Sequence, residues 1–252
     1  MKVMKVNQFP LLDYFTEEAI DRLRVNVGFT GMNKKVIMIT SSVPNEGKSY
    51  VSANLWRQLA MAGKRTVLVD ADMRKTEMRS TLRLTTDNEF AGLSHYLAGQ
   101  ASIEDILYAT NQANAYIIPT TTLINPSLLL EGDRLQVLLQ TLRERFDYIL
   151  VDTPPLGVVS DGQRFATMCD GCLLVIRAHS TSRSLIKESL AQLERVNCPL
   201  IGPVLNRVEE KRSTYYHAGG YYSKRTKYYY ASDSAKKGGK KEEAPAKKAK
   251  QD

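Results

Sequence analysis

The residues with the clearest chemical potential begin with a loop-like stretch, Ser42–Ser49, which reads Ser-Val-Pro-Asn-Glu-Gly-Lys-Ser after an apolar run. Backbone N–H groups of such a loop at a helix start can surround phosphate, while Lys48 reaches the β- and γ-oxygens and Ser49 offers a hydroxyl ligand to Mg²⁺. Ser42 stands where the standard motif has its first glycine. Taken alone, a Gly-Lys-Ser sequence is equally compatible with an ordinary turn before a helix.

Two further stretches place carboxylates directly after buried apolar runs. One reads Val-Leu-Val-Asp-Ala-Asp-Met-Arg and supplies Asp70, Asp72 and Arg74, and the other reads Ile-Leu-Val-Asp-Thr-Pro-Pro and supplies Asp152. Any one such acid is usually a strand entering its loop. Three elements in this order predict a magnesium-nucleotide site, because the carboxyl ends of parallel strands meet at one edge of a sheet.

The chain also carries a dense cluster of phenols downstream of these stretches. Seven of its 13 tyrosines lie among glycines, lysines and an arginine, at Tyr215, Tyr216, Tyr221, Tyr222, Tyr228, Tyr229 and Tyr230. A phosphate donor site and many acceptors on one chain predict an enzyme that phosphorylates its own tail. The alternatives are an aromatic interaction tail or an RNA-stacking platform, but no RNA-binding fold accompanies it.

Alternating apolar and helical stretches must position these residues. Strands are expected at 36–40, 66–70, 116–119, 148–152, 172–177 and 200–206, and helices at 48–62, 132–145 and 182–196. This alternation predicts a doubly wound, mostly parallel sheet in a three-layer α/β/α domain of the P-loop NTPase type. A preceding helix at 16–29, with Thr16 as N-cap, should dock on the core or on a neighbouring subunit.

The distribution of charge argues against one class of partner and separates a globular domain from a tail. The net charge is +8, and the segment from Arg207 to Asp252 holds 13 Lys/Arg against 6 Asp/Glu, so +7 of it belongs to the tail. The nearly neutral body argues against nucleic acid as a partner. We therefore expect a kinase-type domain at 1–208 and a flexible tail, rich in tyrosine and then lysine, at 209–252.

No long apolar run and no export signal are found in the sequence, which predicts a cytoplasmic protein. Its three cysteines are too few for a disulfide scaffold. Cys169-x-x-Cys172 has zinc-ligand spacing, but without a second pair these residues are better interpreted as core cysteines.

The three motifs and the tyrosine cluster together resemble the bacterial tyrosine kinases of capsule and exopolysaccharide synthesis, which carry Walker A, A′ and B motifs. Further resemblances are Glu18-Ala19 with Leu23-Arg24, Asn125-Pro126-Ser127 before a helix, and Val204-Leu205-Asn206 at the last strand. The resemblance spans roughly residues 17 to 230. It implies an ATP-dependent protein-tyrosine autokinase that uses Mg²⁺ and regulates capsular or exopolysaccharide synthesis or export.

The resemblance also implies residue roles. Lys48, Asp70, Asp72 and Arg74 would act in catalysis, with Asp70 orienting or deprotonating the phenol; an ion pair of Arg74 with Asp70 or Asp72 is an equally fair alternative. The metal ligands would be Ser49, Asp70, Asp72 and Asp152. The nucleotide would be bound by Ser42, Asn45, Glu46, Gly47, Lys48, Ser49, Tyr50 and Asn206.

Partners follow from the same resemblance. They are a transmembrane adaptor of the polysaccharide co-polymerase type, which would bring the protein to the inner face of the membrane, a tyrosine phosphatase, and further copies in a ring-shaped homo-oligomer. Asp21 and Leu128 argue against that ring, because each replaces a family residue of different charge. Asn45 and Tyr50 replace a glycine and a threonine of the family, and slower turnover is expected from them.

A rival interpretation is a partitioning or division-site ATPase, which switches between monomer and dimer on ATP without transferring phosphate to tyrosine. That group carries a signature lysine at the second position of its P-loop, where this chain has Val43. It also leaves the tyrosine cluster without a role.

Overall fold

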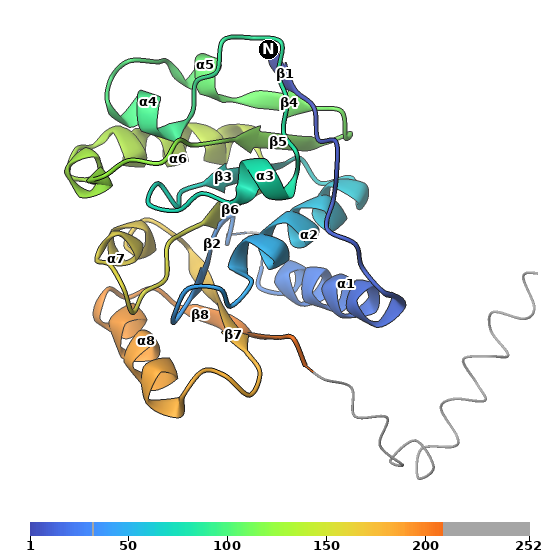
Figure 1. Cartoon of the computed structure of the whole chain (residues 1–252), viewed down its shortest axis with the longest axis vertical. Coiled ribbons are helices and arrows are strands. Elements are labelled where there is room, and N and C mark those ends of the chain that lie inside the picture. Colours follow the sequence, from blue (N-terminus) through green and yellow to red (C-terminus); the bar gives the residue numbers. More distant parts are fainter. Residues whose placement is uncertain (32, 209–252) are drawn as a thin grey trace, which may run out of the picture. The chain divides into compact units, whose positions relative to one another are not determined.

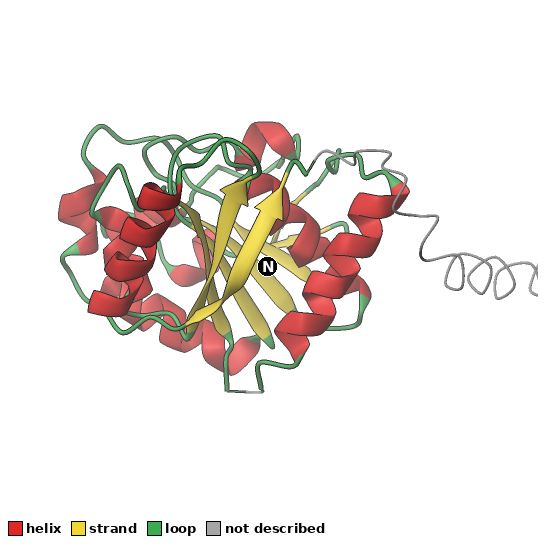
Figure 2. Cartoon of the chain, turned by 90° about the horizontal axis from the view of Figure 1, so that it is seen from below, coloured by secondary structure: helices red, strands yellow, loops and turns green. Residues whose placement is uncertain are grey.

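The computed structural model describes residues 1–31 and 33–208, which form one sheet between two layers of helices (Figures 1 and 2). The sheet has the order β1-β4-β5-β3-β6-β2-β7-β8. All neighbouring pairs are parallel except β4 with β5. The strands are β1 (Lys2–Met4), β2 (Val36–Ser41), β3 (Thr66–Asp70), β4 (Tyr108–Thr110), β5 (Ala115–Ile118), β6 (Tyr148–Asp152), β7 (Gly171–Arg177) and β8 (Leu200–Asn206).

The helices alternate with the strands, as the apolar pattern predicts. They are α1 (Tyr14–Gly28), α2 (Lys48–Met61), α3 (Met78–Thr81), α4 (Leu93–Leu97), α5 (Ile103–Ile106), the 3₁₀ helix η1 (Pro126–Leu130), α6 (Arg134–Arg145), α7 (Asp161–Ala166) and α8 (Arg183–Arg195). The predicted fold class is confirmed, and all six expected strands are present within one residue of their expected ends. The apolar pattern does not predict β1, β4 or the short helices α3, α4, α5, α7 and η1.

Both faces of the sheet are buried, which fixes the central strands. In β2, Ile37 and Ile39 face the cluster that includes α1, α2 and α3, while Val36 and Met38 face the side of α6, α7 and α8. All four side chains are fully buried. Since burying one such aliphatic side chain stabilises a fold by about 1.5–3 kcal/mol, β2 provides a rigid base for the loop that follows it.

The N-terminal helix α1 begins earlier than expected, and its cap is a different residue. Asp13 is the N-cap, and its carboxylate accepts a 2.7 Å hydrogen bond from the Thr16 backbone N–H, so the prediction of Thr16 as cap was wrong. The hydrogen bonds from Thr16 lower the pKa of Asp13. Ile20 and Val27 are the buried residues of the helix, which packs on α2 and so docks on the core as expected.

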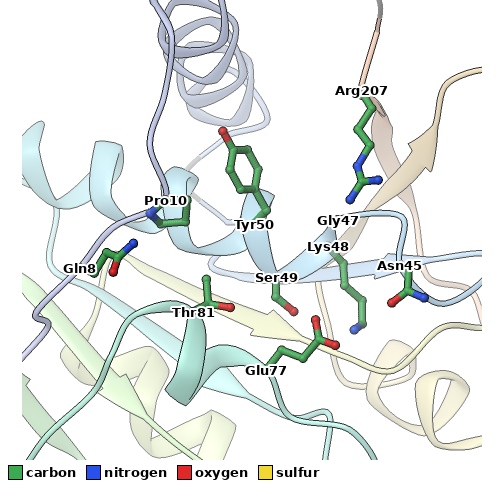
Figure 3. A pocket seen from close by; sticks show the side chains of 10 residues that line it. All are labelled: Gln8, Pro10, Asn45, Gly47, Lys48, Ser49, Tyr50, Glu77, Thr81 and Arg207. Carbon is green, nitrogen blue, oxygen red and sulfur yellow. The ribbon is translucent and has the colours of Figure 1, made fainter.

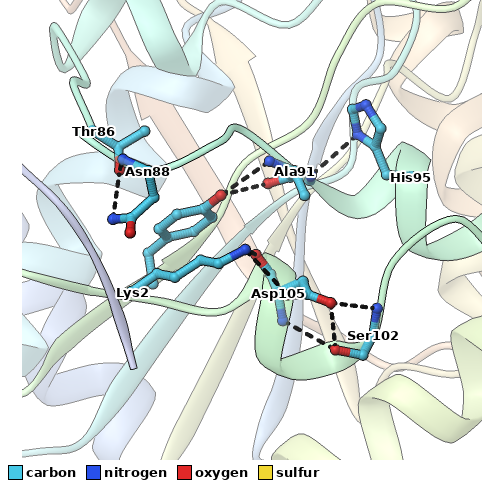
Figure 4. Close-up of polar contacts among 9 residues, drawn as sticks. Lys2, Thr86, Asn88, Ala91, His95, Ser102 and Asp105 are labelled. Carbon is cyan, nitrogen blue, oxygen red and sulfur yellow. Dashed lines mark hydrogen bonds and ion pairs between the residues drawn. The ribbon is translucent and has the colours of Figure 1, made fainter.

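The sheet edge at β1 is fixed by polar contacts that have no local sequence signature (Figure 4). Lys2 Nζ lies 3.1 Å from Asp105 Oδ1, and Asp105 also accepts from the Ser102 hydroxyl at the start of α5. The Tyr108 hydroxyl donates to the carbonyl of Ala91. These contacts, 103 residues apart along the chain for the first pair, hold a strand too short to be detected from its own pattern.

The topology brings the three predicted motifs together. Strands β3, β6 and β2 are adjacent in the sheet, and the register pairs Asp70 with Asp152 and Ile39 with Asp152. The loop after β2 and the acids ending β3 and β6 therefore share one edge. In the part of the chain that the structure describes, no helix has the length and apolar character needed to cross a bilayer.

Residues 209–252 lie outside the described part, and so do all seven tyrosines of the cluster. The domain division at residue 208 stays a prediction.

Candidate active site

The loop between β2 and α2 depends on two residues with positive φ. Gly47, the N-cap of α2, has φ 94°, and a Cβ there would lie 2.0 Å from Asn206 Nδ2, so only glycine fits. Asn45 has φ 64°, a left-handed conformation that asparagine tolerates better than most residues. The departure from the family glycine at position 45 is thus compatible with the loop's backbone.

Glu46 braces this loop from inside the protein. Its side chain is buried, and its carboxylate accepts hydrogen bonds from the backbone N–H of Val43 at 2.9 Å and of Arg177 at 3.1 Å, and from the Thr181 hydroxyl. The carboxylate therefore serves the loop's shape. The nucleotide contact expected of Glu46 stays a prediction.

Ser42 and Asn206 also tie the loop to distant elements. The buried Ser42 hydroxyl accepts a 2.9 Å bond from Ser189 on α8. Asn206, at the end of β8, donates from Nδ2 to the Glu46 carbonyl at 2.8 Å, and its Oδ1 accepts from the Arg207 N–H. The adenine contact expected of Asn206 remains a prediction, and in the structure its amide anchors the loop to the last strand.

Lys48 and Asp72 form an ion pair at the centre of the site, with Nζ 2.9 Å from Oδ2. Burial lowers the pKa of Lys48, but the neighbouring charges of Asp152 and Asp72 outweigh it, and the net pKa is raised. The Lys75 backbone N–H donates to the other oxygen of Asp72 at 3.0 Å. Lys48 is therefore a fixed positive charge at the edge where the acids converge.

Asp70 and Asp152 are both buried beside this pair and are short of positive charge. Burial, followed by the charge of Asp152, raises the pKa of Asp70 to about 8. Burial also raises the pKa of Asp152, against the lowering effect of Lys48 and the Ser49 hydroxyl. Asp70 Oδ2 accepts from the Thr76 hydroxyl, whereas Oδ1 is buried without a hydrogen-bond partner among the described residues.

This arrangement fits a magnesium ion with a nucleotide phosphate. An orphaned carboxylate oxygen and three carboxylates around one ammonium favour a hard cation with oxygen ligands. The residues that the structure describes contain no group of three or more His, Cys, Asp or Glu that could hold a metal ion by themselves. Mg²⁺ commonly takes only one or two protein carboxylates and completes its shell with phosphate oxygens and water, so the residues present fit a magnesium ion that is shared with a nucleotide.

A cavity of about 430 Å³ lies against the loop, and Lys48 and Ser49 are among the residues that line it (Figure 3). Tyr50 lines it and donates from its hydroxyl to the Leu11 carbonyl at 3.2 Å. Gln8 and Pro10, which precede α1, and Thr81 of α3 also line the cavity, and no sequence motif predicts their position. The lining residues are Gln8, Pro10, Asn45, Gly47, Lys48, Ser49, Tyr50, Glu77, Thr81 and Arg207.

Arg74 pairs with a residue that sequence analysis missed. Its Nε donates to Asp161 Oδ2 at 2.6 Å, and its Nη2 donates to the Ser127 hydroxyl at 2.9 Å. The alternative of an ion pair with Asp70 or Asp72 was wrong. Asp161 lies 87 residues from Arg74, at the start of the short helix α7, so no spacing rule connects the two.

The two residues that depart from the family's oligomer contacts are both on the surface of the described domain. Asp21 accepts from Arg24 Nε at 2.8 Å within α1, and Leu128 is largely exposed on η1. The cysteines interpreted as core residues are placed in or against the cluster under α7 and α8, with Cys172 and Cys198 buried and Cys169 partly buried.

Comparisons with known proteins agree with this geometry. A family model described as an AAA domain matches residues 34–197. The tyrosine-protein kinase CpsD of Streptococcus agalactiae is 36% identical over 201 residues, which cover 79% of this chain and 87% of CpsD. The kinase domain of the Escherichia coli tyrosine kinase ETK superposes with a TM-score of 0.73 at 31% identity, covering 79% of this chain and 78% of that one.

The septum site-determining protein MinD of Pyrococcus horikoshii, solved with Mg-ADP, is also similar, with a TM-score of 0.60 at 26% identity over 71% of this chain and 72% of MinD. It shares the three-layer fold, but the kinases match at higher identity and TM-score, so the switch ATPase is not favoured. The chain belongs to the bacterial tyrosine kinase family.

Proposed function

We propose that this protein is an ATP-dependent tyrosine kinase that phosphorylates its own tyrosine cluster and thereby regulates capsular or exopolysaccharide synthesis or export. One observation carries the proposal. The ion pair of Lys48 with Asp72 at 2.9 Å and the pairing of Asp70 with Asp152 in the sheet register bring one lysine and three buried acids together, and Lys48 lines a cavity of about 430 Å³.

The chemistry asked of the site is an in-line phosphoryl transfer. A bond forms between the phenolic oxygen and the γ-phosphorus, the bond from that phosphorus to the β,γ-bridging oxygen breaks, and the phenolic proton passes to a carboxylate. A phenol of pKa about 10 is almost wholly protonated at neutral pH, so this acceptor lowers the barrier. Asp70 is our candidate, since it is buried and one of its oxygens has no partner among the described residues.

The loop and its lysine would hold the donor. Lys48 would contact the β- and γ-oxygens, and backbone N–H groups from Asn45 to Ser49 would surround the phosphates, with Tyr50 at the cavity wall. Mg²⁺, when bound, supplies positive charge to the β- and γ-oxygens. The residues that would hold it are Ser49 and Asp152, with Asp70 and Asp72 as direct ligands or ligands through water.

Binding of the metal and ATP also bears on proton transfer. Asp70, with a pKa of about 8 in the nucleotide-free protein, is largely protonated near neutrality. A cation nearby favours the ionised form, as opposite charges do generally. Asp70 would therefore become a competent proton acceptor only when the donor is in place.

The partners proposed here are those that the family resemblance implies. They are a transmembrane adaptor of the polysaccharide co-polymerase type, which recruits the kinase to the cytoplasmic face of the membrane, a tyrosine phosphatase that reverses the modification, and further copies of the chain. A pull-down of the adaptor's cytoplasmic segment by the purified kinase, with and without Mg-ATP, tests the first of these.

The kinase activity itself is tested with the purified full chain and Mg-ATP, mapping phosphate by mass spectrometry. Lys48→Met removes the central cation, and Lys64→Met is the matched control at an exposed lysine after α2. The parent and the control should carry phosphotyrosine between Tyr215 and Tyr230, and Lys48→Met should carry none. ATP turnover without phosphotyrosine in the parent would instead support the switch ATPase.

A further inference from the structure

Arg74 is held by two side chains from segments far apart in the sequence. Besides the bonds from Nε to Asp161 and from Nη2 to Ser127, the Ser127 hydroxyl donates to Asp161 Oδ1 at 2.7 Å, which closes a three-membered cycle. Arg74 lies in the loop after β3, Ser127 in η1 and Asp161 at the start of α7. The cycle therefore ties together three separate segments of the domain.

The cycle is asymmetric in burial. The Asp161 side chain is 4% exposed, whereas that of Arg74 is 32% exposed, so the carboxylate is fixed in the protein and the guanidinium opens outward. A guanidinium has five N–H donors in a rigid fork. Nε and Nη2 are used in the cycle, and Nη1 makes no hydrogen bond to any residue of the described domain.

Arg74 also lies within the electric field of the acid cluster. The hydrogen bond to Asp161 raises the pKa of Arg74 most, burial opposes it, and the charges of Asp161 and then Asp72 add to the increase. Asp72 is the partner of Lys48, so the cycle and the phosphate-binding loop are electrostatic neighbours. Arg74 follows Asp72 by two residues, so their Cα atoms are at most about 7 Å apart, and the cycle is attached to the loop that carries the partner of Lys48.

We propose that Asp161 and Ser127 are positioning residues, which hold Arg74 so that its remaining N–H groups bind the oxygens of the transferred phosphoryl group. The inference rests on the proposed kinase function. A guanidinium locked in place costs no reorganisation when charge develops on those oxygens, and it is most effective when its orientation is fixed in advance. If Asp161 instead held Arg74 away from the phosphate, the Asp161→Asn variant would transfer phosphate to tyrosine faster than the parent.

The test compares Arg74→Ala, Asp161→Asn, Ser127→Ala and the double variant Arg74→Ala/Asp161→Asn in the full chain with Mg-ATP. Arg74→Ala and Asp161→Asn should each lower kcat for tyrosine transfer by about 100-fold, the order that misplacing a catalytic group costs. The affinity for fluorescent Mg-ADP should change by less than about twofold, since ADP lacks the transferred group. Ser127→Ala should lower kcat about fivefold, for one lost hydrogen bond.

The double variant separates positioning from an independent effect. If Asp161 acts through Arg74, the double variant is no slower than Arg74→Ala alone. The matched control is Asp170→Asn, which breaks an equally short ion pair, 2.6 Å to Arg143, at the opposite edge of the sheet. Its kcat should equal that of the parent.

Two results would overturn the inference: an Asp161→Asn variant as fast as the parent or faster, or additive losses in the double variant. If thermal melting shows that Asp161→Asn does not fold, the kcat of Ser127→Ala tests the inference, because this variant keeps the ion pair and removes one hydroxyl. A Ser127→Ala variant as fast as the parent would then overturn it. A parent that hydrolyses ATP without labelling tyrosine would refute the proposed function only. In that case the same variants are compared by their rates of ATP hydrolysis, with the same expected order.

Discussion

Two acidic side chains at opposite ends of the strands differ in how well the protein compensates their charge: Asp170 lies at the amino ends (the amino edge) and Asp70 at the carboxyl ends (the carboxyl edge). At the amino edge, Asp170 accepts from the backbone N–H groups of Lys35 and Val36, each at 2.8 Å, and from both terminal nitrogens of Arg143. At the carboxyl edge, Asp70 has one hydroxyl partner in Thr76 and an oxygen without any partner among the described residues.

The pKa values follow this difference. Burial raises the pKa of Asp170, but the bonds from Arg143 and the two backbone N–H groups outweigh it, and the net pKa is lowered. The pKa of Asp70 is raised to about 8, because burial and the charge of Asp152 dominate. Asp170 therefore stabilises the fold as a well-compensated carboxylate, while Asp70 is a buried carboxyl group whose ionised form lacks compensation, as is common at functional sites.

The largest effect on the rate of tyrosine transfer is expected from replacing Asp70 at the carboxyl ends of the strands. Asp70→Asn should lower tyrosine transfer by about 10²–10⁴-fold, the usual contribution of a general base, and should raise the melting temperature of the nucleotide-free protein at alkaline pH. Transfer kinetics and thermal melting of one preparation measure both. Transfer at the parental rate would show that Asp70 does not accept the proton.

The matching replacement of Asp170 at the amino ends should lower stability and leave the rate of tyrosine transfer unchanged. Asp170→Asn removes the charge that Arg143 and two backbone N–H groups share, and should lower the free energy of unfolding by about 2 kcal/mol. Urea unfolding measures it. The comparison of the edges fails if this variant loses transfer activity while keeping its stability.

The pH dependence of stability sharpens the same contrast. A carboxyl whose pKa rises from 3.8 to about 8 on folding binds more protons in the folded state between these values, so its contribution to stability is lost as the pH rises through 8. In EDTA, the melting temperature of Asp70→Asn minus that of the parent should grow from about pH 5 to pH 8. The corresponding difference for Asp170→Asn should stay constant over that range, because a lowered pKa acts only at more acidic pH. Equal slopes for the two variants would contradict the assignment.

The smallest effect concerns two asparagines with positive φ, one near each edge: Asn45 at φ 64° and Asn114 at φ 62°. Asn45→Gly and Asn114→Gly should each change the free energy of unfolding by less than about 1 kcal/mol, because glycine also adopts this conformation. Only Asn45→Gly should alter the dissociation constant of Mg-ADP, since Asn45 lines the cavity. Isothermal titration of both variants checks this, and equal binding would remove Asn45 from the nucleotide site.

The parts of the site that the sequence predicts are those with a local pattern. Lys48 follows its glycine at the start of a helix, and Asp70 and Asp152 end apolar runs, so periodicity and strand ends place them at one edge. The convergence then depends only on β3, β6 and β2 being neighbours, which a parallel sheet makes natural.

The unpredicted parts depend on contacts between distant segments. Asp161 reaches Arg74 across 87 residues, and β1 is three residues long with its partner more than 100 residues away. For the helix cap, Asp13 and Thr16 are both good N-caps by type, and only the backbone geometry decides between them. Glu46 gave no sign that its carboxylate turns inward, because nothing near it in sequence supplies the donors at Arg177 and Thr181.

The bond from Asn206 to the Glu46 carbonyl places the root of the tail at the phosphate-binding loop, and Arg207 lines the cavity itself. Tyr215 lies eight positions after Arg207, a span of at most about 28 Å. Under the proposed function, covalent attachment would give the acceptor tyrosines an effective concentration at the site in the millimolar range that does not depend on the protein concentration. Because its acceptors are covalently attached, such an enzyme does not require a high affinity for free peptides. We expect it to bind tyrosine peptides that are not part of the chain weakly.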